Sequence, residues 1–135
     1  MARIVLTNAF VEIGGVNLSD HIASVELSQE VEEVETTAFG DSARTRTGGL
    51  ANNSLSLDFH QDFAAASVDA TITPLIGGTA SFEVRASADA ASSTNPKWTG
   101  TVLLTEWTPV AGAIGELSTA SITWPVSGAV TRGTA

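Results

Sequence analysis

The sequence lacks cysteine and tyrosine altogether, and only six of its 135 residues are lysine or arginine. Without cysteine it has no disulfide, no thiolate zinc site and no cysteine nucleophile, and it does not fit the small secreted scaffolds that depend on disulfides. No apolar run approaches the roughly 18 residues of a membrane-spanning helix. The start of the chain also lacks the ~7–15-residue apolar stretch of a secretory signal. These absences predict a soluble protein that is made in a cytoplasm and has no membrane partner.

Fifteen aspartate and glutamate residues outnumber the six basic residues, and the net charge is −9. Surfaces that grip nucleic acid are basic, because they replace the counterions of the phosphates. An acidic surface repels DNA, RNA and anionic lipid. The composition therefore argues against specific nucleic-acid binding, although solubility alone also explains an acidic balance.

No nucleotide-binding, zinc-protease or serine-hydrolase motif occurs in the chain. The cluster nearest to a metal site is Asp58, His60 and Asp62, which share one face of a predicted strand. A polar exposed face followed by a helix N-cap at Asp62 explains the same residues. The three tryptophans suit buried strand positions better than a sugar-binding platform. We therefore expect no catalytic residue, no metal site and no cofactor, and we interpret the protein as a non-enzyme.

Apolar and polar residues alternate with period two along most of the chain, which is typical of half-buried strands. The length fits one domain over residues 1–135. The pattern predicts strands over 9–13, 16–18, 22–35, 50–60, 81–88, 98–107 and 119–126, and one helix within 62–76. The expected fold class is mainly β: a β-sandwich or partial barrel of antiparallel strands with one flanking α-helix and a long inter-strand loop. The loop 89–96 is expected to be mobile, and the tail 127–135 to fray.

Residues 22–35 form the most unusual predicted strand, because at ~3.3 Å per residue it would be roughly 46 Å long and exceeds the usual 3–10 residues. The alternation places Val25, Leu27 and Val31 on a core face. Val34 breaks the parity, which predicts a β-bulge near Glu32 and Glu33. The next strand is predicted to turn Leu55, Leu57 and Phe59 inward. Two such strands extend beyond a small sandwich and need a partner to cover them.

The segment 36–49 between these strands is the longest predicted loop, and loops above ~12 residues are usually functional or disordered. It contains two of the six basic residues, which on an acidic molecule suit the carboxylates of a neighbouring subunit. The candidate inter-subunit residues are Thr36, Thr37, Phe39, Gly40, Asp41, Arg44, Arg46, Gly48 and Gly49.

Three segments form a distinctive set. They are the entry Gly15-Val16-Asn17-Leu18-Ser19-Asp20-His21-Ile22, the segment Val34-Glu35-Thr36-Thr37-Ala38-Phe39-Gly40-Asp41 with Arg44 and Gly49-Leu50, and the strand Ser54-Leu55-Ser56-Leu57-Asp58-Phe59. Together they resemble the major tail tube proteins of long-tailed bacteriophages. The order of strand, loop, strand, helix and further strands is also similar, and the resemblance covers nearly the whole chain. Some members of that family carry a second, immunoglobulin-like domain, which we do not expect here, because the sequence to Ala135 is accounted for by one domain.

The resemblance implies a self-assembling subunit whose hexameric rings stack into a tube, with inner sheets of neighbours joined and the long loop reaching an adjacent subunit. It implies a virion tail location, assembly in the cytoplasm of a bacterial host, tape-measure, tail-tip and terminator proteins as partners, and DNA that passes through without specific binding. It also makes the polar face of the two long strands the candidate lumen. The residues of that face are Glu26, Ser28, Glu30, Glu32, Ser54, Ser56 and Asp58.

Other functions stay open on the sequence. A carbohydrate- or receptor-binding β-sandwich module of a virion would favour exposed tryptophan near loops. The tube subunit of a contractile injection or secretion system shares the expected architecture. An esterase or glycosidase is the remotest alternative, because no pair of carboxylates is selected across a cleft.

Overall fold

The computed structural model describes residues 5–64 and 67–134, which fold into two antiparallel sheets with one short helix. The larger sheet has the strand order β2-β1-β5-β6-β8 and the smaller one β3-β4-β7. The strands are β1 (Phe10–Ile13), β2 (Val16–Asn17), β3 (Ile22–Glu35), β4 (Arg46–His60), β5 (Thr79–Arg85), β6 (Lys97–Leu103), β7 (Thr119–Pro125) and β8 (Thr131–Gly133). The helix is α1 (Val68–Ile72), and 3-10 turns span Ser19–His21 and Thr73–Leu75.

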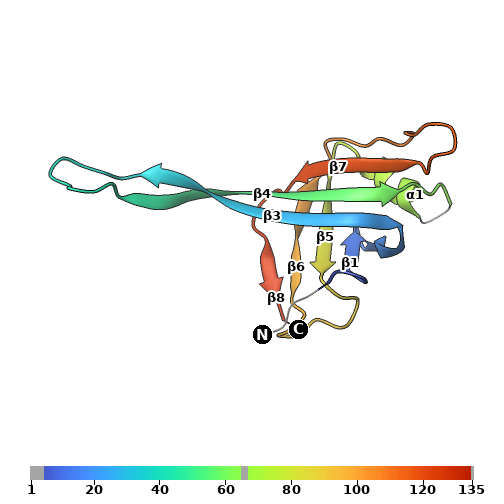
Figure 1. The fold of residues 1–135 in the computed structure, drawn as a ribbon, viewed down its shortest axis with the longest axis horizontal. Helices are drawn as coiled ribbons and strands as arrows, with labels where there is room; N and C mark the ends of the chain where they lie inside the picture. The colour runs from blue at the N-terminus through green and yellow to red at the C-terminus, as the bar shows by residue number, and fades with distance from the viewer. Residues whose placement is uncertain (1–4, 65–66, 135) are drawn as a thin grey trace.

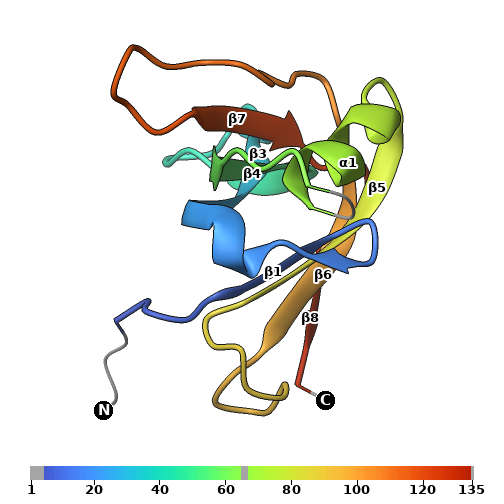
Figure 2. The same cartoon turned by 90° about the vertical axis from the view of Figure 1, so that its right-hand side faces the viewer.

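The two sheets pack as the layers of a sandwich, and Figure 2 shows β3, β4 and β7 above the larger sheet. Neither sheet closes on itself within the described residues. The predicted mainly-β sandwich with one helix is therefore confirmed. Across the same residues, no helix combines the length and apolar character that a membrane crossing needs.

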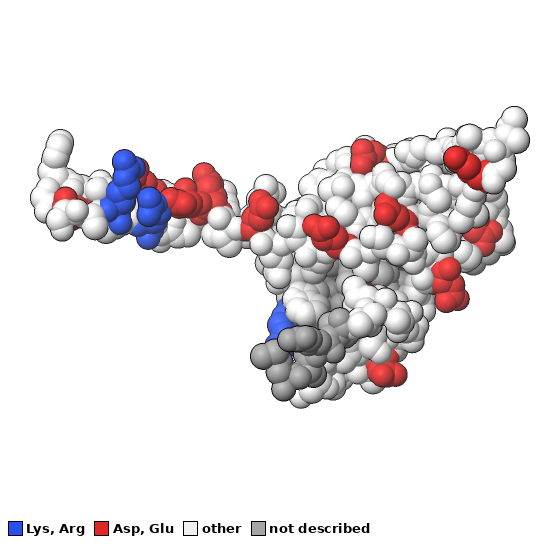
Figure 3. Space-filling model, in the orientation of Figure 1, with Lys and Arg blue, Asp and Glu red and all other residues white. Residues whose placement is uncertain are grey.

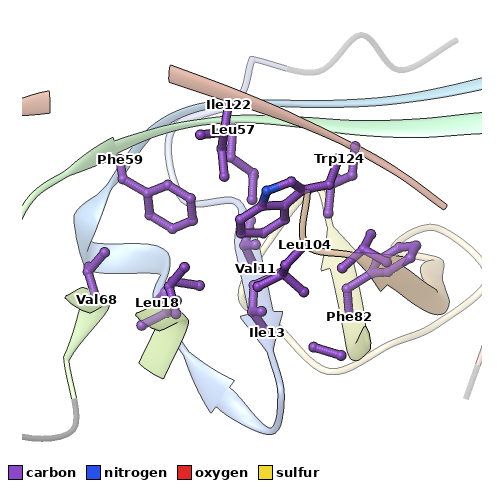
Figure 4. Close-up of a cluster of buried hydrophobic side chains, with 14 of the residues drawn as sticks. Val11, Ile13, Leu18, Leu57, Phe59, Val68, Phe82, Leu104, Ile122 and Trp124 are labelled. Carbon is purple, nitrogen blue, oxygen red and sulfur yellow. The ribbon is translucent and has the colours of Figure 1, made fainter. Parts of the chain in front are cut away.

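The core lies between the layers and follows the predicted alternation (Figure 4). On β4 it contains Leu55, Leu57 and Phe59, each at most 2% exposed, as the sequence predicted. Trp124 of β7 is fully buried, and its indole N–H donates to the backbone oxygen of Glu106 at 2.8 Å. The ring of Phe59 meets that of Trp107 edge to face, with centroids 5.4 Å apart. The remaining core side chains are Val11, Ile13, Leu18, Val68, Ile72, Ala80, Phe82, Val84, Val102, Leu104, Ala120 and Ile122.

The helix is shorter than the predicted span and begins at Val68, with Ser67 as its N-cap. Asp62 is therefore not the N-cap that the sequence indicated. Its carboxylate instead accepts the backbone N–H of Ala64 at 2.9 Å, and its backbone oxygen accepts the N–H of Asp69. Only Val68 and Ile72 of the helix are buried, because a single turn presents a single apolar edge to the core.

The hairpin of β3 and β4 extends far beyond the sandwich (Figure 1), and every residue from 29 to 52 is exposed. We call residues 29–52 the arm. β3 has the predicted bounds, but β4 begins at Arg46 rather than at residue 50. Arg46, Gly48 and Gly49 therefore belong to a strand and not to the loop, which is limited to residues 36–45. The glycines indicate a turn in isolation, whereas pairing with β3 keeps them extended.

A bulge interrupts the arm where the sequence predicted an irregularity. Val31 pairs with Ala51 and Glu33 pairs with Gly48, so β4 places two residues opposite Glu32 alone. The extra residue thus lies on β4 and not on β3. The glycines of β4 permit the close approach, since a Cβ on Gly48 would lie 3.2 Å from Cγ1 of Val31.

Two further predictions were wrong. Val31 is 62% exposed, because parity assigns it a face but the other sheet does not extend beneath the arm. The tail is not wholly frayed, since β8 pairs with β6. In the loop after β5, which was expected to be mobile, the Asn95 side chain binds the backbone of Ser87, Asp89 and Ala90. Backbone oxygens as partners leave no signal in a sequence pattern.

Candidate assembly interface

The tip of the arm is a tight turn that projects one aromatic side chain. Asp41 donates its backbone N–H to Ala38, its carboxylate accepts the Ala38 N–H at 2.8 Å, and Gly40 has a φ of 95°. Such a positive φ at the third residue of a turn favours glycine. Phe39 precedes that glycine and is fully exposed. The turn therefore holds a phenyl ring in solvent at the far end of the molecule.

The two basic residues of the arm pair with carboxylates of their own hairpin. Arg44 reaches Glu35 at 3.0 Å, and Arg46 forms an ion pair with Glu33 across the strands. The sequence assigned both residues to a neighbour's carboxylates, and within one chain they have these partners instead. Figure 3 shows their blue surface beside the red of the arm. Among the described ion pairs, Glu30 and Glu32 have no cationic partner, so the arm keeps an acidic surplus.

Apolar side chains are exposed along the whole arm. Val31 is 62%, Val34 40% and Leu50 81% exposed, in addition to Phe39 at the tip. Fully burying a side chain of this kind stabilises a complex by ~1.5–3 kcal/mol. Several of them on one projecting hairpin are typical of a protein–protein contact. Of the predicted inter-subunit residues, Thr36 and Thr37 form bonds within the hairpin, to Thr45 and Glu35.

The outer side of the smaller sheet is polar, and we call this side the polar face. The strand register aligns Glu26 with Ser56 and Thr123, and the two hydroxyls are 3.0 Å apart. Asp58 lies opposite Ser121 on the same side. The structure therefore brings six of the seven predicted lumen residues together: Glu26, Ser28, Glu30, Ser54, Ser56 and Asp58. The seventh, Glu32, lies at the bulge beyond the paired rows.

His21, Asp62 and Ser67 lie together where β3 begins, but they do not form a hydrolase triad. The same ring nitrogen of His21, Nε2, is 3.4 Å from the Asp62 carboxylate and 3.3 Å from the Ser67 hydroxyl. In a triad the imidazole bridges acid and serine through its two nitrogens. Here Ser67 donates directly to Asp62 at 2.8 Å. The cluster fastens β3 to the segment before α1.

Asp62 is the carboxylate of this cluster. The backbone N–H of Ala64, the Ser67 hydroxyl and the nearby His21 hold its pKa below the ordinary value, against a smaller opposing effect of desolvation. Of the three residues that the sequence offered as metal ligands, Asp62 lies beside Ser67 and His21, whereas Asp58 and His60 lie on β4. Within the described residues no group of three or more potential ligands gathers to hold a metal ion.

The smaller sheet has two edges that differ in exposure. β3 is the outer strand on one side, and no described strand lies beyond it. β7 is the outer strand on the other side, and the segment 104–118 runs beside it in Figures 1 and 2. A long uncovered edge strand is a template for pairing with another chain. The β3 edge therefore continues the candidate interface from the body into the arm.

No family model and no curated protein matches the chain. Solved structures do match it. A chain of the virion of a native gene transfer agent particle aligns with 15% identity over 93% of this chain and 95% of its own length, with a TM-score of 0.73. The chain therefore has the fold of this virion protein.

Two further solved structures have the same fold. A chain of the tail of an empty gene transfer agent particle, determined with C6 symmetry, is 18% identical over 85% of this chain and 83% of its own, with a TM-score of 0.66. A chain from the sheath/tube terminator of an extracellular contractile injection system is 13% identical over 98% and 97%, with a TM-score of 0.72.

Proposed function

We propose that the chain, as one domain over residues 1–135, is a structural subunit of a phage-like tail tube and acts by assembling with copies of itself. Six copies form a ring, rings stack into a tube, and the tube conducts DNA during ejection. The role is mechanical and requires no catalytic residue. The tail is assembled in the host cytoplasm and carries tape-measure, tail-tip and terminator proteins as partners.

One observation carries this proposal: a sandwich of ordinary size extends a two-stranded arm that is exposed over its whole length. A lone two-stranded hairpin is marginally stable in water, and this one also exposes Val31, Leu50 and Phe39. A second copy that covers the arm would remove both costs. The fold shared with a tail determined with C6 symmetry supports the hexameric ring as the arrangement.

The polar face supplies the lumen in this proposal. It carries Glu26, Glu30 and Asp58, whereas the two described cations of the same hairpin, Arg44 and Arg46, are paired with Glu35 and Glu33 nearer the tip. In a closed channel these carboxylates repel phosphates from the wall, so the counterion release that drives DNA binding does not occur. DNA can then slide through without adhering.

The test is the state of the purified full-length chain over a range of concentrations, by sedimentation and negative-stain microscopy. We expect a transition from monomer to rings or tubes with six-fold symmetry. A monodisperse monomer at every concentration and salt would contradict the proposal. Deleting residues 37–44 and joining the strands with a short turn provides a matched variant, which should stay folded and monomeric.

A tube subunit of a contractile injection or secretion system is the second candidate. The likeness to a chain of a sheath/tube terminator, over nearly all of both chains, favours it. Its rings would have the same arm contacts, and co-purification with a sheath protein would distinguish it. A sugar-binding module has no such support, because Trp124 is buried and Trp98 and Trp107 are half-buried.

A further inference from the structure

The β7 edge of the smaller sheet would have to pair with a neighbour's β3 if the sheets of a ring are joined. Backbone groups of successive residues point to alternate sides of a strand. Thr123 turns its N–H away from β4, because that N–H bonds to a group outside the sheet. Ser121 and Pro125, two residues to either side, share this outward direction. These residues form the edge that a further strand would meet.

That edge is blocked in the single chain. The N–H of Thr123 donates to the carboxylate of Glu106 at 3.0 Å. Pro125 has no N–H to offer. No backbone hydrogen bond joins residues 105–117 to β7 within the described part of the chain, although that segment runs beside the strand (Figures 1 and 2). The segment therefore occupies the place of a strand without pairing as one.

The blocking group can leave at small cost to the core. The backbone oxygen of Glu106 is held by the Trp124 indole, so only the side chain must rotate to release the Thr123 N–H. Trp107 can stay packed on Phe59, because the rest of the segment, residues 108–117, is loosely attached. Its Val110 is 81% and Ile114 106% exposed, and the Gln61 amide donates to Pro109 at 2.7 Å. Moving residues 108–117 would uncover little apolar surface.

We infer that the side chain of Glu106 reversibly blocks strand pairing at the β7 edge. In the free subunit its carboxylate takes the outward N–H of Thr123 and keeps β7 from pairing with β3 of another copy. When a ring closes, the neighbour's β3 supplies backbone oxygens in its place. Charged side chains and proline are common devices against edge-to-edge association. This inference rests on the proposed function and adds a reason why free subunits stay apart.

The experiment compares wild type with Glu106→Ala and Glu106→Gln in concentration series followed by light scattering. Glu106→Ala should assemble at a roughly tenfold lower concentration, since it loses one charge-assisted hydrogen bond that competes with assembly. Glu106→Gln keeps an acceptor oxygen and should stay near wild type. Glu116→Ala removes the same charge from the same loop, where its carboxylate accepts the Ala113 N–H, and should behave as wild type.

Hydrogen exchange at the Thr123 amide gives a second measurement. It should be faster in monomeric Glu106→Ala than in wild type, and slow again in assembled Glu106→Ala because the neighbour's strand protects it. Fast exchange in the assembly would overturn the inference, and so would Glu106→Gln or Glu116→Ala assembling as readily as Glu106→Ala. If wild type forms rings and Glu106→Ala assembles no more readily, only the inference about Glu106 is overturned. If none of the proteins forms rings, both the proposed function and the inference about Glu106 are overturned.

Discussion

A Cβ atom on Gly49 of β4 would lie 3.0 Å from Cγ2 of Val34 on β3. That contact is tighter than most Cβ contacts, so a larger residue at this position would require Val34 to move by a few tenths of an ångström and would disturb the bulge. The bulge sets the direction in which the arm continues beyond Ala51. The residue at position 49 therefore affects where the tip of the arm would meet a neighbouring subunit.

The Gly49→Ala variant should displace Val34 and redirect the arm. We expect the free energy of unfolding of the body to change by less than ~0.5 kcal/mol, because the position lies outside the core, while ring assembly is lost. Urea unfolding and sedimentation measure the two effects. The control is Thr47→Ala. Thr47 lies on β4, as Gly49 does, and pairs with Val34 of β3, and this variant should assemble normally. A Gly49→Ala chain that forms rings as readily as wild type would contradict this role.

Two phenylalanines should separate assembly from folding. Phe39 is fully exposed and Phe59 fully buried. Phe39→Ala should leave the midpoint of urea unfolding unchanged and raise the concentration needed for assembly about tenfold, as expected for ~1.5 kcal/mol of lost burial per contact. Phe59→Ala should cost ~3–5 kcal/mol of folding stability. Equal assembly by Phe39→Ala and wild type would show that the tip makes no contact.

The stability of the body should depend on pH through Asp62. Hydrogen bonds from Ala64 and Ser67 hold its pKa below the ordinary value, so the folded state favours the carboxylate. The resulting stability is fully present above the pKa of the unfolded chain, about 3.9, and is lost as the pH falls through the lower folded value. Wild type should therefore exceed Asp62→Asn in stability at pH 7 and approach it below pH ~4. Thermal unfolding across this range is the measurement, and a difference that does not change with pH would be contrary to it.

The alternation of the sequence predicted the sandwich, the inward side of β4 and the full length of β3, because the period of two directly reports which side chains share a face. It could not predict how far the second sheet extends, and so it placed Val31 in the core. The start of β4 was missed because Gly48 and Gly49 indicate a turn by local propensity, while the register with β3 keeps them extended.

Of the candidate interface, the sequence predicted the polar face, because the parity of the two long strands determines which side chains share a face. It did not predict the ion pairs that Arg44 and Arg46 make within the hairpin, because ion pairs across a hairpin depend on register. Glu106 gave no signal, because the sequence predicted it to lie near the end of a strand over 98–107, whereas β6 ends at Leu103. Its contact with Thr123 exists only in three dimensions.

The arm should need its internal ion pairs to stay straight. Arg44→Glu with Arg46→Glu would place like charges beside Glu35 and Glu33, and repulsion across the strands should splay the hairpin. Exposed pairs contribute only ~0–1 kcal/mol each, so the body should keep its stability while assembly fails. Lys97→Glu at the start of β6 is a control with charge reversal outside the arm. Normal rings from the double variant would show that neither the pairs nor a neighbour needs these arginines.

The charge of the polar face should govern DNA passage and leave assembly possible. Replacing Glu26, Glu30 and Asp58 by lysine keeps the alternation of β3 and β4 and changes each position by two charges. If the face lines the lumen, DNA phosphates then meet a basic wall and release counterions, so DNA passage should slow and depend steeply on salt. Assembly is followed by microscopy, and passage by the rate of DNA release from particles built with the variant. The matched control is Glu12→Lys with Glu83→Lys, two directly paired positions on β1 and β5 of the other sheet, which should leave release unchanged. If the polar-face variant released DNA at the wild-type rate, the face would lie outside the channel; if the control slowed release instead, the larger sheet would form its wall.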